Sequence, residues 1–227
     1  MTSEDDLLRF PVRAPKGAGQ AYLVRPGEDG EGRGPGVLVL HSWWGLTDQM
    51  KDLCDRLCDE GFVVMAPDLF AGARPANAVE AQEALNEMDP NTATNLVLSS
   101  GVALRSATDD PSGAVAIIGF SMGASLALWA AARQPESFNK VVAYYGTSSL
   151  DFSHMTAQVL GHFVDDDVML SDDDVTLMSA ELFEAGLAPE IWHYDSVHWF
   201  AEQGSHGCYD EANAELAWQR TLEFLKR

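Results

Sequence analysis

Residues 114–129 read AVAIIGFSMGASLALW, and this stretch decides the fold. Its first five residues are all apolar, as expected for a strand that is buried on both faces of a sheet. Residues 119–123 then match the pattern G-x-S-x-G, and an alanine-rich helix is predicted over 122–133. A serine between two glycines at a strand-to-helix turn is typical of an exposed nucleophile, because glycine lets the two backbones approach closely. Ser121 is therefore the predicted nucleophile, and the first amides of the helix can donate to a developing negative charge.

Short apolar runs alternate with amphipathic stretches over the rest of the chain. Strands are predicted at residues 21–24, 37–40, 62–67, 114–118, 141–145, 157–163 and 190–194. Helices are predicted at residues 47–60, 75–88, 91–107, 122–133, 172–186 and 209–225. This alternation indicates an α/β protein with a mostly parallel, doubly wound sheet and helices on both faces. The glycine-rich residues 26–36 form a hairpin or a connection rather than a domain boundary, so we expect a single domain over residues 1–227.

The composition excludes several classes of protein. The 227 residues include 46% hydrophobic side chains, enough for a core, and 14 Lys and Arg against 35 Asp and Glu, a formal net charge of −21. Such an acidic protein is poorly suited to bind nucleic acid or an anionic membrane, so neither is expected as a partner. Neither a basic leader followed by an apolar run nor an apolar stretch of about 18 residues is present, and three cysteines are too few for a disulfide framework. We expect a cytoplasmic monomer or small homo-oligomer.

A serine nucleophile needs a base, and in α/β-hydrolases the partners follow in the order serine, acid, histidine. Of the six histidines, His198 lies in the loop after the last predicted strand, where it can reach the nucleophile, and His206 is the alternative. The acid is expected after the preceding predicted strand, where Asp165 to Asp167 follow one another and spacing alone does not choose among them. These acidic residues lack the glycine of a calcium-binding loop, so no metal and no cofactor are expected.

Taken together, the motifs resemble the dienelactone hydrolase family of α/β-hydrolases over most of residues 10–227. The stretches that carry the resemblance are LHSWWG at 40–45, APDLF at 66–70, GFSMG at 119–123, AYYG at 143–146, HWFA at 198–201 and RTLEFL at 220–225. The resemblance implies an α/β-hydrolase fold and a catalytic triad of Ser121, Asp167 and His198, with Asp166 as the alternative acid.

The resemblance also implies an oxyanion hole, formed by the backbone amides of Trp43 and Met122. The typical nucleophile of the family is cysteine, activated with the help of a glutamate, and here Ser121 and Ser42 stand at these two positions. Losing both together fits a serine that relies on a histidine base. Dienelactone-cleaving members hold the substrate carboxylate with arginines, one of them four residues after the catalytic histidine. That position is Glu202 here, and a carboxylate repels an anionic substrate.

Aromatic residues near the predicted loops complete the candidate pocket, together with Ser42 and Glu202. They are Trp43, Trp44, Trp199 and Phe200. They suit a neutral, apolar acyl or alcohol group, and filling of the core is an equally good interpretation. We therefore predict a serine hydrolase that cleaves small carboxylic esters or lactones, neutral rather than anionic. The alternatives are a non-catalytic α/β-hydrolase scaffold that binds a ligand or partner, and a hydrolase of amides or peptides.

Overall fold

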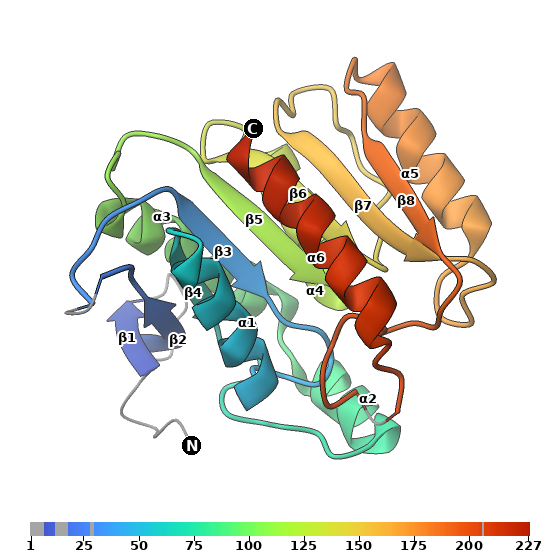
Figure 1. Ribbon diagram of the computed structural model, residues 1–227, viewed down its shortest axis with the longest axis horizontal. Coiled ribbons are helices and arrows are strands. Elements are labelled where there is room, and N and C mark those ends of the chain that lie inside the picture. Colours follow the sequence, from blue (N-terminus) through green and yellow to red (C-terminus); the bar gives the residue numbers. More distant parts are fainter. Residues whose placement is uncertain (1–6, 12–17, 28–29, 206) are drawn as a thin grey trace. The chain divides into compact units, whose positions relative to one another are not determined.

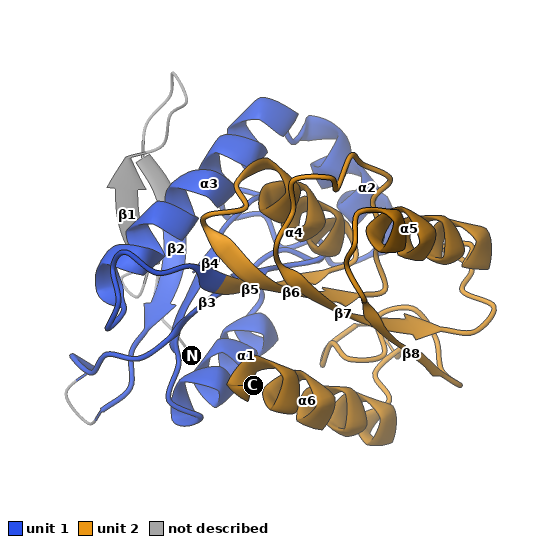
Figure 2. Cartoon of the chain, turned by 90° about the horizontal axis from the view of Figure 1, so that it is seen from above, with its two compact units in different colours: residues 1–115 blue, residues 116–227 orange. Residues whose placement is uncertain are grey.

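The computed structural model describes residues 7–11, 18–27, 30–205 and 207–227 (Figure 1). The chain divides into two compact units, residues 1–115 and residues 116–227, which Figure 2 shows in different colours. The single domain expected over residues 1–227 stays a prediction.

The first unit carries four strands in the order β1-β2-β4-β3. Its elements are β1 (Leu7–Pro11), β2 (Ala18–Val24), β3 (Gly36–Leu40), α1 (Asp48–Asp59), β4 (Val63–Pro67), α2 (Ala78–Glu87) and α3 (Pro90–Ala107). β3 and β4 are parallel, whereas β2 pairs antiparallel with both β1 and β4. Because β4 lies between β2 and β3, these two strands do not pair as the hairpin that was one of the two expectations for them. β1 was not predicted from the sequence.

Local patterns explain the elements around β3 and β4, whose residues are all buried. Helix α1 begins where the Thr47 hydroxyl accepts a hydrogen bond from the Met50 amide. Its buried positions include Met50, Cys54 and Leu57, spaced three and four residues apart as one face of a helix requires. After the helix, Gly61 adopts a φ of 95°, which is open to glycine at little cost and turns the chain into β4.

The second unit carries four strands in the order β5-β6-β7-β8. Its elements are β5 (Val115–Phe120), α4 (Met122–Arg133), β6 (Phe138–Tyr144), β7 (Gln158–Val164), α5 (Asp172–Glu184), β8 (Glu190–Tyr194) and α6 (Glu211–Lys226). The pairs β6–β7 and β7–β8 are parallel. Helices α4 and α5 cover one face of these strands and α6 covers the other (Figure 2). The loops that leave the carboxyl ends of parallel strands therefore carry the predicted acid and base.

A buried polar network ties α6 to the sheet of the second unit. Thr221 of α6 lies 2.7 Å from the Tyr144 hydroxyl and 3.0 Å from Nε2 of His162, and the other ring nitrogen of His162 lies 2.7 Å from the Tyr194 hydroxyl. Burial, with a smaller contribution from the positive charge of Arg220, lowers the pKa of His162 to about 3. His162 is therefore a neutral structural residue, as its position inside the sheet requires.

The predicted strands and helices after residue 20 are all present, with ends that differ by up to three residues. One difference has a clear cause at α2, which was predicted to begin at residue 75. The side chain of Asn77 accepts hydrogen bonds from the amides of Val79 and Glu80, so the helix begins at Ala78.

Candidate active site

The turn between β5 and α4 holds Ser121 in a strained backbone conformation. Its φ of 51° and ψ of −116° are uncommon for a residue with a side chain, and its amide donates to the Tyr144 carbonyl over 2.9 Å. The turn is too tight for larger neighbours. A Cβ added at Gly119 would collide with the Gly123 carbonyl, and one added at Gly146 would collide with the Ser121 carbonyl. Gly119 of the G-x-S-x-G motif and Gly146 thus permit the sharp turn that presents the serine hydroxyl.

His198 and Asp167 meet the serine through two hydrogen bonds in series. Nε2 of His198 lies 3.0 Å from Oγ of Ser121, and Nδ1 lies 2.7 Å from Oδ2 of Asp167. The side chains of His198 and Asp167 are each only 3% exposed. Because a carboxylate oxygen can only accept, Nδ1 carries the ring proton and Nε2 is left to accept from the serine hydroxyl. The remaining oxygen of Asp167 accepts from the Met169 amide over 2.8 Å.

The other candidates for acid and base are arranged differently. Oδ1 of Asp165 lies 3.1 Å from Nδ1 of His193 in a pair that is exposed to solvent. Asp166 is exposed and adopts a φ of 55°. The structure therefore brings Asp167, rather than its two neighbours, to the imidazole of His198. His206 lies outside the described residues.

Backbone strain concentrates around these three side chains. Among the described residues, five that are not glycine have a positive φ, and four of them belong to this region: Ser121, Tyr145, Asp166 and Trp199. Asp166 and Trp199 directly adjoin Asp167 and His198 in the chain, and the ring of Tyr145 lies 4.8 Å from that of His198. Strain of this kind is kept at functional sites, where the surrounding structure enforces it.

Aromatic rings support the histidine. The Trp199 ring meets His198 edge-on at 4.6 Å. Phe200 is fully buried, with its ring 5.6 Å from Tyr145 and 4.9 Å from Tyr194. Of the two predicted pocket residues here, Trp199 is half-buried beside the imidazole, whereas Phe200 packs within the unit.

Glu202 follows Phe200 by two residues and is only 8% exposed. Its Oε1 accepts a hydrogen bond of 2.9 Å from the hydroxyl of Tyr145. Burial raises the pKa of Tyr145 well above its ordinary value, and the neighbouring Glu202 carboxylate raises it further. Glu202 was predicted from the sequence, whereas Tyr145 was not, and the only sequence signal for Tyr145 was its place in the AYYG stretch.

The remaining predicted residues lie at the start of α4 and on the loop that follows β3. Met122 is the first residue of α4, where backbone amides have no partner within the helix. Ser42, Trp43 and Trp44 belong to the first unit, on the loop that follows β3. Ser42 is fully buried and its hydroxyl accepts from the Trp44 amide over 3.3 Å. The two indole rings meet edge-on at 5.3 Å.

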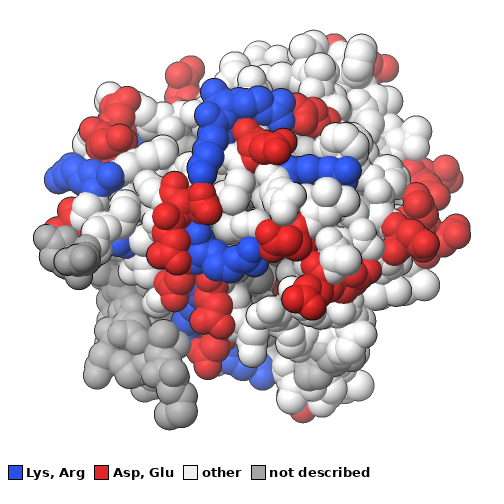
Figure 3. All heavy atoms as spheres, in the orientation of Figure 1, with Lys and Arg blue, Asp and Glu red and all other residues white. Residues whose placement is uncertain are grey.

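The surface of the protein is acidic, and its possible metal ligands are dispersed among the described residues. The face drawn in Figure 3 carries acidic side chains with basic ones interspersed, in a chain whose formal net charge is −21. Within the described part of the chain, no three His, Cys, Asp or Glu side chains gather in a way that could hold a metal ion. Among the same residues, no helix is both long and apolar enough to cross a membrane.

The chain is similar to known proteins over most of its length. The family model for the dienelactone hydrolase family matches residues 20–227. The carboxymethylenebutenolidase of a Pseudomonas species is 32% identical over 236 residues, covering 93% of this chain and 92% of its own. The protein usf of Aquifex pyrophilus is 27% identical over 203 residues, covering 85% of this chain and 88% of its own.

A solved structure confirms the fold class. A dienelactone hydrolase-like promiscuous phosphotriesterase from metagenomic libraries is 21% identical, with a TM-score of 0.82 and 97% of each chain covered. At this level of sequence identity the structural similarity shows only the fold. This is the mostly parallel α/β-hydrolase fold predicted from the sequence.

Proposed function

This chain belongs to the dienelactone hydrolase family, and we propose that it hydrolyses neutral carboxylic esters or lactones through a triad of Ser121, His198 and Asp167. The observation that carries the proposal is the unbroken line of hydrogen bonds from the serine hydroxyl through both ring nitrogens of His198 to the Asp167 carboxylate. A serine hydroxyl is a weak nucleophile unless a positioned base takes its proton.

The reaction proceeds in two acyl transfers. Oγ of Ser121 attacks the carbonyl carbon while Nε2 of His198 takes the hydroxyl proton, and Asp167 stabilises the resulting imidazolium. The tetrahedral intermediate collapses, His198 returns the proton to the leaving alcohol oxygen, and an acyl-serine ester remains. Water then gives a proton to His198 and attacks the ester, which releases the carboxylic acid and the free serine.

The oxyanion is stabilised by backbone amides. Met122, at the first position of α4, supplies one N–H, and the helix dipole favours negative charge at that end. Trp43 supplies the second, by the resemblance of its loop to that of the family. Removal of one such donor costs about 10²- to 10³-fold in kcat in measured cases.

The preference for neutral substrates rests on Glu202. Four residues after the proposed catalytic histidine, this buried side chain is a carboxylic acid where anion-binding members carry an arginine. A like charge at that place disfavours a substrate carboxylate. Glu202 also supports Tyr145 beside His198, so it is kept in place by packing and hydrogen bonding.

The decisive experiment combines turnover of p-nitrophenyl esters with labelling by a fluorophosphonate probe. Ser121→Ala is expected to abolish both, whereas Ser106→Ala, an exposed serine on α3, is expected to change neither. Full turnover and labelling in Ser121→Ala would disprove the serine mechanism. Cleavage of matched anilides at rates equal to the esters would instead favour the amide hydrolase. Absence of both turnover and labelling in the wild type would favour the non-catalytic scaffold.

The substrate preference is tested with two p-nitrophenyl esters of equal chain length, one ending in a methyl group and one in a carboxylate. The neutral ester is expected to have the higher kcat/KM by about tenfold, the order of magnitude of one like-charge contact in a partly screened site. Glu202→Gln keeps an acceptor for Tyr145 and removes the charge. It should therefore lower the ratio of kcat/KM for the neutral ester to kcat/KM for the anionic ester. An unchanged ratio would contradict the assignment of Glu202.

A further inference from the structure

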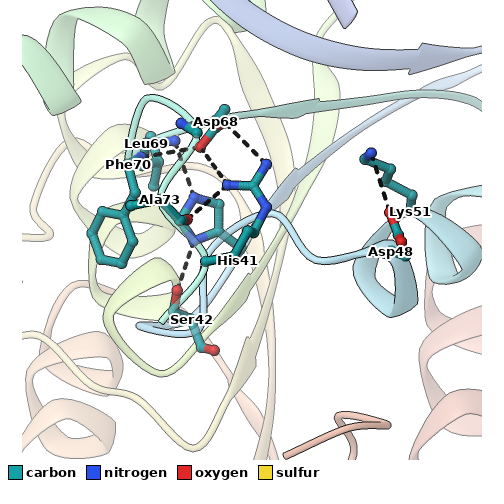
Figure 4. Close-up of polar contacts among 10 residues, drawn as sticks. His41, Ser42, Asp48, Lys51, Asp68, Leu69, Phe70 and Ala73 are labelled. Carbon is teal, nitrogen blue, oxygen red and sulfur yellow. Dashed lines mark hydrogen bonds and ion pairs between the residues drawn. The ribbon is translucent and has the colours of Figure 1, made fainter. Parts of the chain in front are cut away.

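The imidazole of His41, in the first unit, bridges two loops. His41 follows β3 directly and its side chain is fully buried. Figure 4 shows the ring between the loop that it begins and the turn that follows β4. Nε2 lies 3.0 Å from the amide nitrogen of Leu69, and Nδ1 lies 2.6 Å from the carbonyl oxygen of Ser42. Both ring nitrogens therefore have backbone partners.

These partners determine the tautomer of the ring. The Leu69 amide can only donate, so Nε2 accepts and carries no proton. Nδ1 then carries the proton and donates it to the Ser42 carbonyl. Burial, partly offset by the hydrogen bond to Ser42, lowers the pKa of His41 to about 4. The ring is therefore neutral over the ordinary pH range, with its proton directed at Ser42.

The Ser42 carbonyl belongs to the same peptide group as the Trp43 amide. This peptide bond is trans and planar, so the C=O and the N–H point in opposite directions and turn together. The carbonyl oxygen also accepts from the Gly45 amide over 3.2 Å, within the same turn. Two donors on one carbonyl hold the plane of the peptide and with it the direction of the Trp43 N–H.

The other end of the bridge is equally well anchored. The Asp68 carboxylate accepts from the amides of Phe70 and Gly72 and forms an ion pair of 3.1 Å with Arg74. These contacts shape the turn that presents the Leu69 amide to His41 (Figure 4). The Phe70 ring also meets the His41 ring edge-on at 5.2 Å.

Close packing between the two loops leaves little freedom. Gly45 adopts a φ of 81°, and a Cβ placed there would collide with the carbonyl of Ala73, in the turn that follows β4. The loop after β3 therefore rests on the turn after β4, with the His41 ring as the polar bridge between them. A buried polar bridge whose members are all satisfied is able to specify one loop conformation.

We propose that His41 is a positioning residue for the reaction, which fixes the direction of the Trp43 amide by holding the Ser42 carbonyl. The inference rests on the proposed function, because that function assigns the Trp43 amide to the oxyanion hole. His41 touches neither the substrate nor the reacting atoms in this role. Its effect falls on the transition state, where the negative charge on the substrate oxygen develops.

Two amide variants separate the two ring nitrogens. In His41→Asn the side-chain NH₂ occupies the place of Nδ1 and can donate to the Ser42 carbonyl, but it does not reach Leu69. In His41→Gln the side-chain oxygen occupies the place of Nε2 and can accept from Leu69, but the side chain no longer donates to the Ser42 carbonyl. Both variants are made in the full chain and assayed with a neutral p-nitrophenyl ester. Thermal unfolding is measured in parallel.

His41→Gln is expected to lower kcat by about 10- to 100-fold with KM within threefold, less than complete loss of a donor because the Gly45 amide remains. His41→Asn is expected to keep kcat within about fivefold of the wild type, even where it lowers the melting temperature more. Equal kcat in the two variants, or losses that follow the melting temperature, would overturn the inference. Should His41→Gln not fold, a tenfold or larger loss in His41→Asn would overturn it, and retention of kcat would support it. A wild type without esterase activity would overturn the proposed function and this inference together, whereas an active wild type with an unaffected His41→Gln would overturn the inference alone.

Discussion

Replacing Asp167 by asparagine tests the proposed triad most sharply, because its two carboxylate oxygens have different partners. One oxygen accepts from the Met169 amide over 2.8 Å and the other faces Nδ1 of His198 at 2.7 Å. Asparagine has only one oxygen. With that oxygen toward the Met169 amide, its NH₂ group faces Nδ1, which must then accept and lose its proton. The ring proton moves to Nε2, where it faces Ser121 and removes the base.

The expected loss follows from this change of tautomer and from the lost charge beside the imidazolium. We expect kcat for p-nitrophenyl esters to fall by about 10³- to 10⁴-fold, which corresponds to about 4 to 5.5 kcal/mol of activation free energy. Asp166→Asn is the matched control. This neighbour is exposed with a φ of 55°, a conformation that asparagine tolerates well, so kcat should stay within about twofold.

The assay measures kcat and KM for both variants, with thermal unfolding to show that both are folded. A variant Asp167→Asn within tenfold of the wild type would refute the tautomer reasoning. A large loss in Asp166→Asn with little loss in Asp167→Asn would assign the acid to Asp166 instead.

Three further predictions concern stability. The pKa of His162 is about 3 in the folded protein and about 6.5 when unfolded. Between these two pH values the unfolded chain binds a proton that the folded protein does not. The free energy of unfolding therefore falls by about 1.4 kcal/mol per pH unit as the pH drops from about 6.5 to about 3. In His162→Gln, the free energy of unfolding measured by urea titration should therefore fall less between pH 6 and pH 4 than in the wild type. An equal pH dependence in the two proteins would contradict a buried, neutral His162. Gly119→Ala should destabilise the protein by about 3 kcal/mol or more, because the added Cβ collides with the backbone. Gly186→Ala, at a position with open space around it, should cost only about 1 kcal/mol. Equal melting temperatures of the two variants would argue against the tight turn at Gly119. Tyr145→Phe should lower the free energy of unfolding by about 1 to 3 kcal/mol, because buried Glu202 loses one hydrogen-bond donor. Its kcat should stay within about threefold of the wild type, because the ring beside His198 is kept. A large fall in kcat at unchanged stability would show that the hydroxyl acts in the reaction.

Several features of the protein are encoded locally, and the sequence by itself determined them. The apolar run before Ser121 predicts a buried strand, and the two glycines predict the strained turn that the structure contains. The spacing of Met50, Cys54 and Leu57 predicts helix α1 in the same way. Such patterns are readable because hydrophobic periodicity and backbone conformation depend on residues only a few positions apart.

The tertiary structure alone decided which polar groups meet. Asp167 and His198 are 31 residues apart, and spacing alone does not choose among three consecutive aspartates, although the family resemblance favoured Asp167. The conformation of the loop, with Asp166 at a positive φ, selects the one that faces the imidazole. Likewise, the hydrogen bond from Tyr145 to Glu202 spans 57 residues, and that between Leu69 and His41 spans 28. Hydrogen bonds need placement to within a few tenths of an ångström, and only the packing of distant segments supplies that precision.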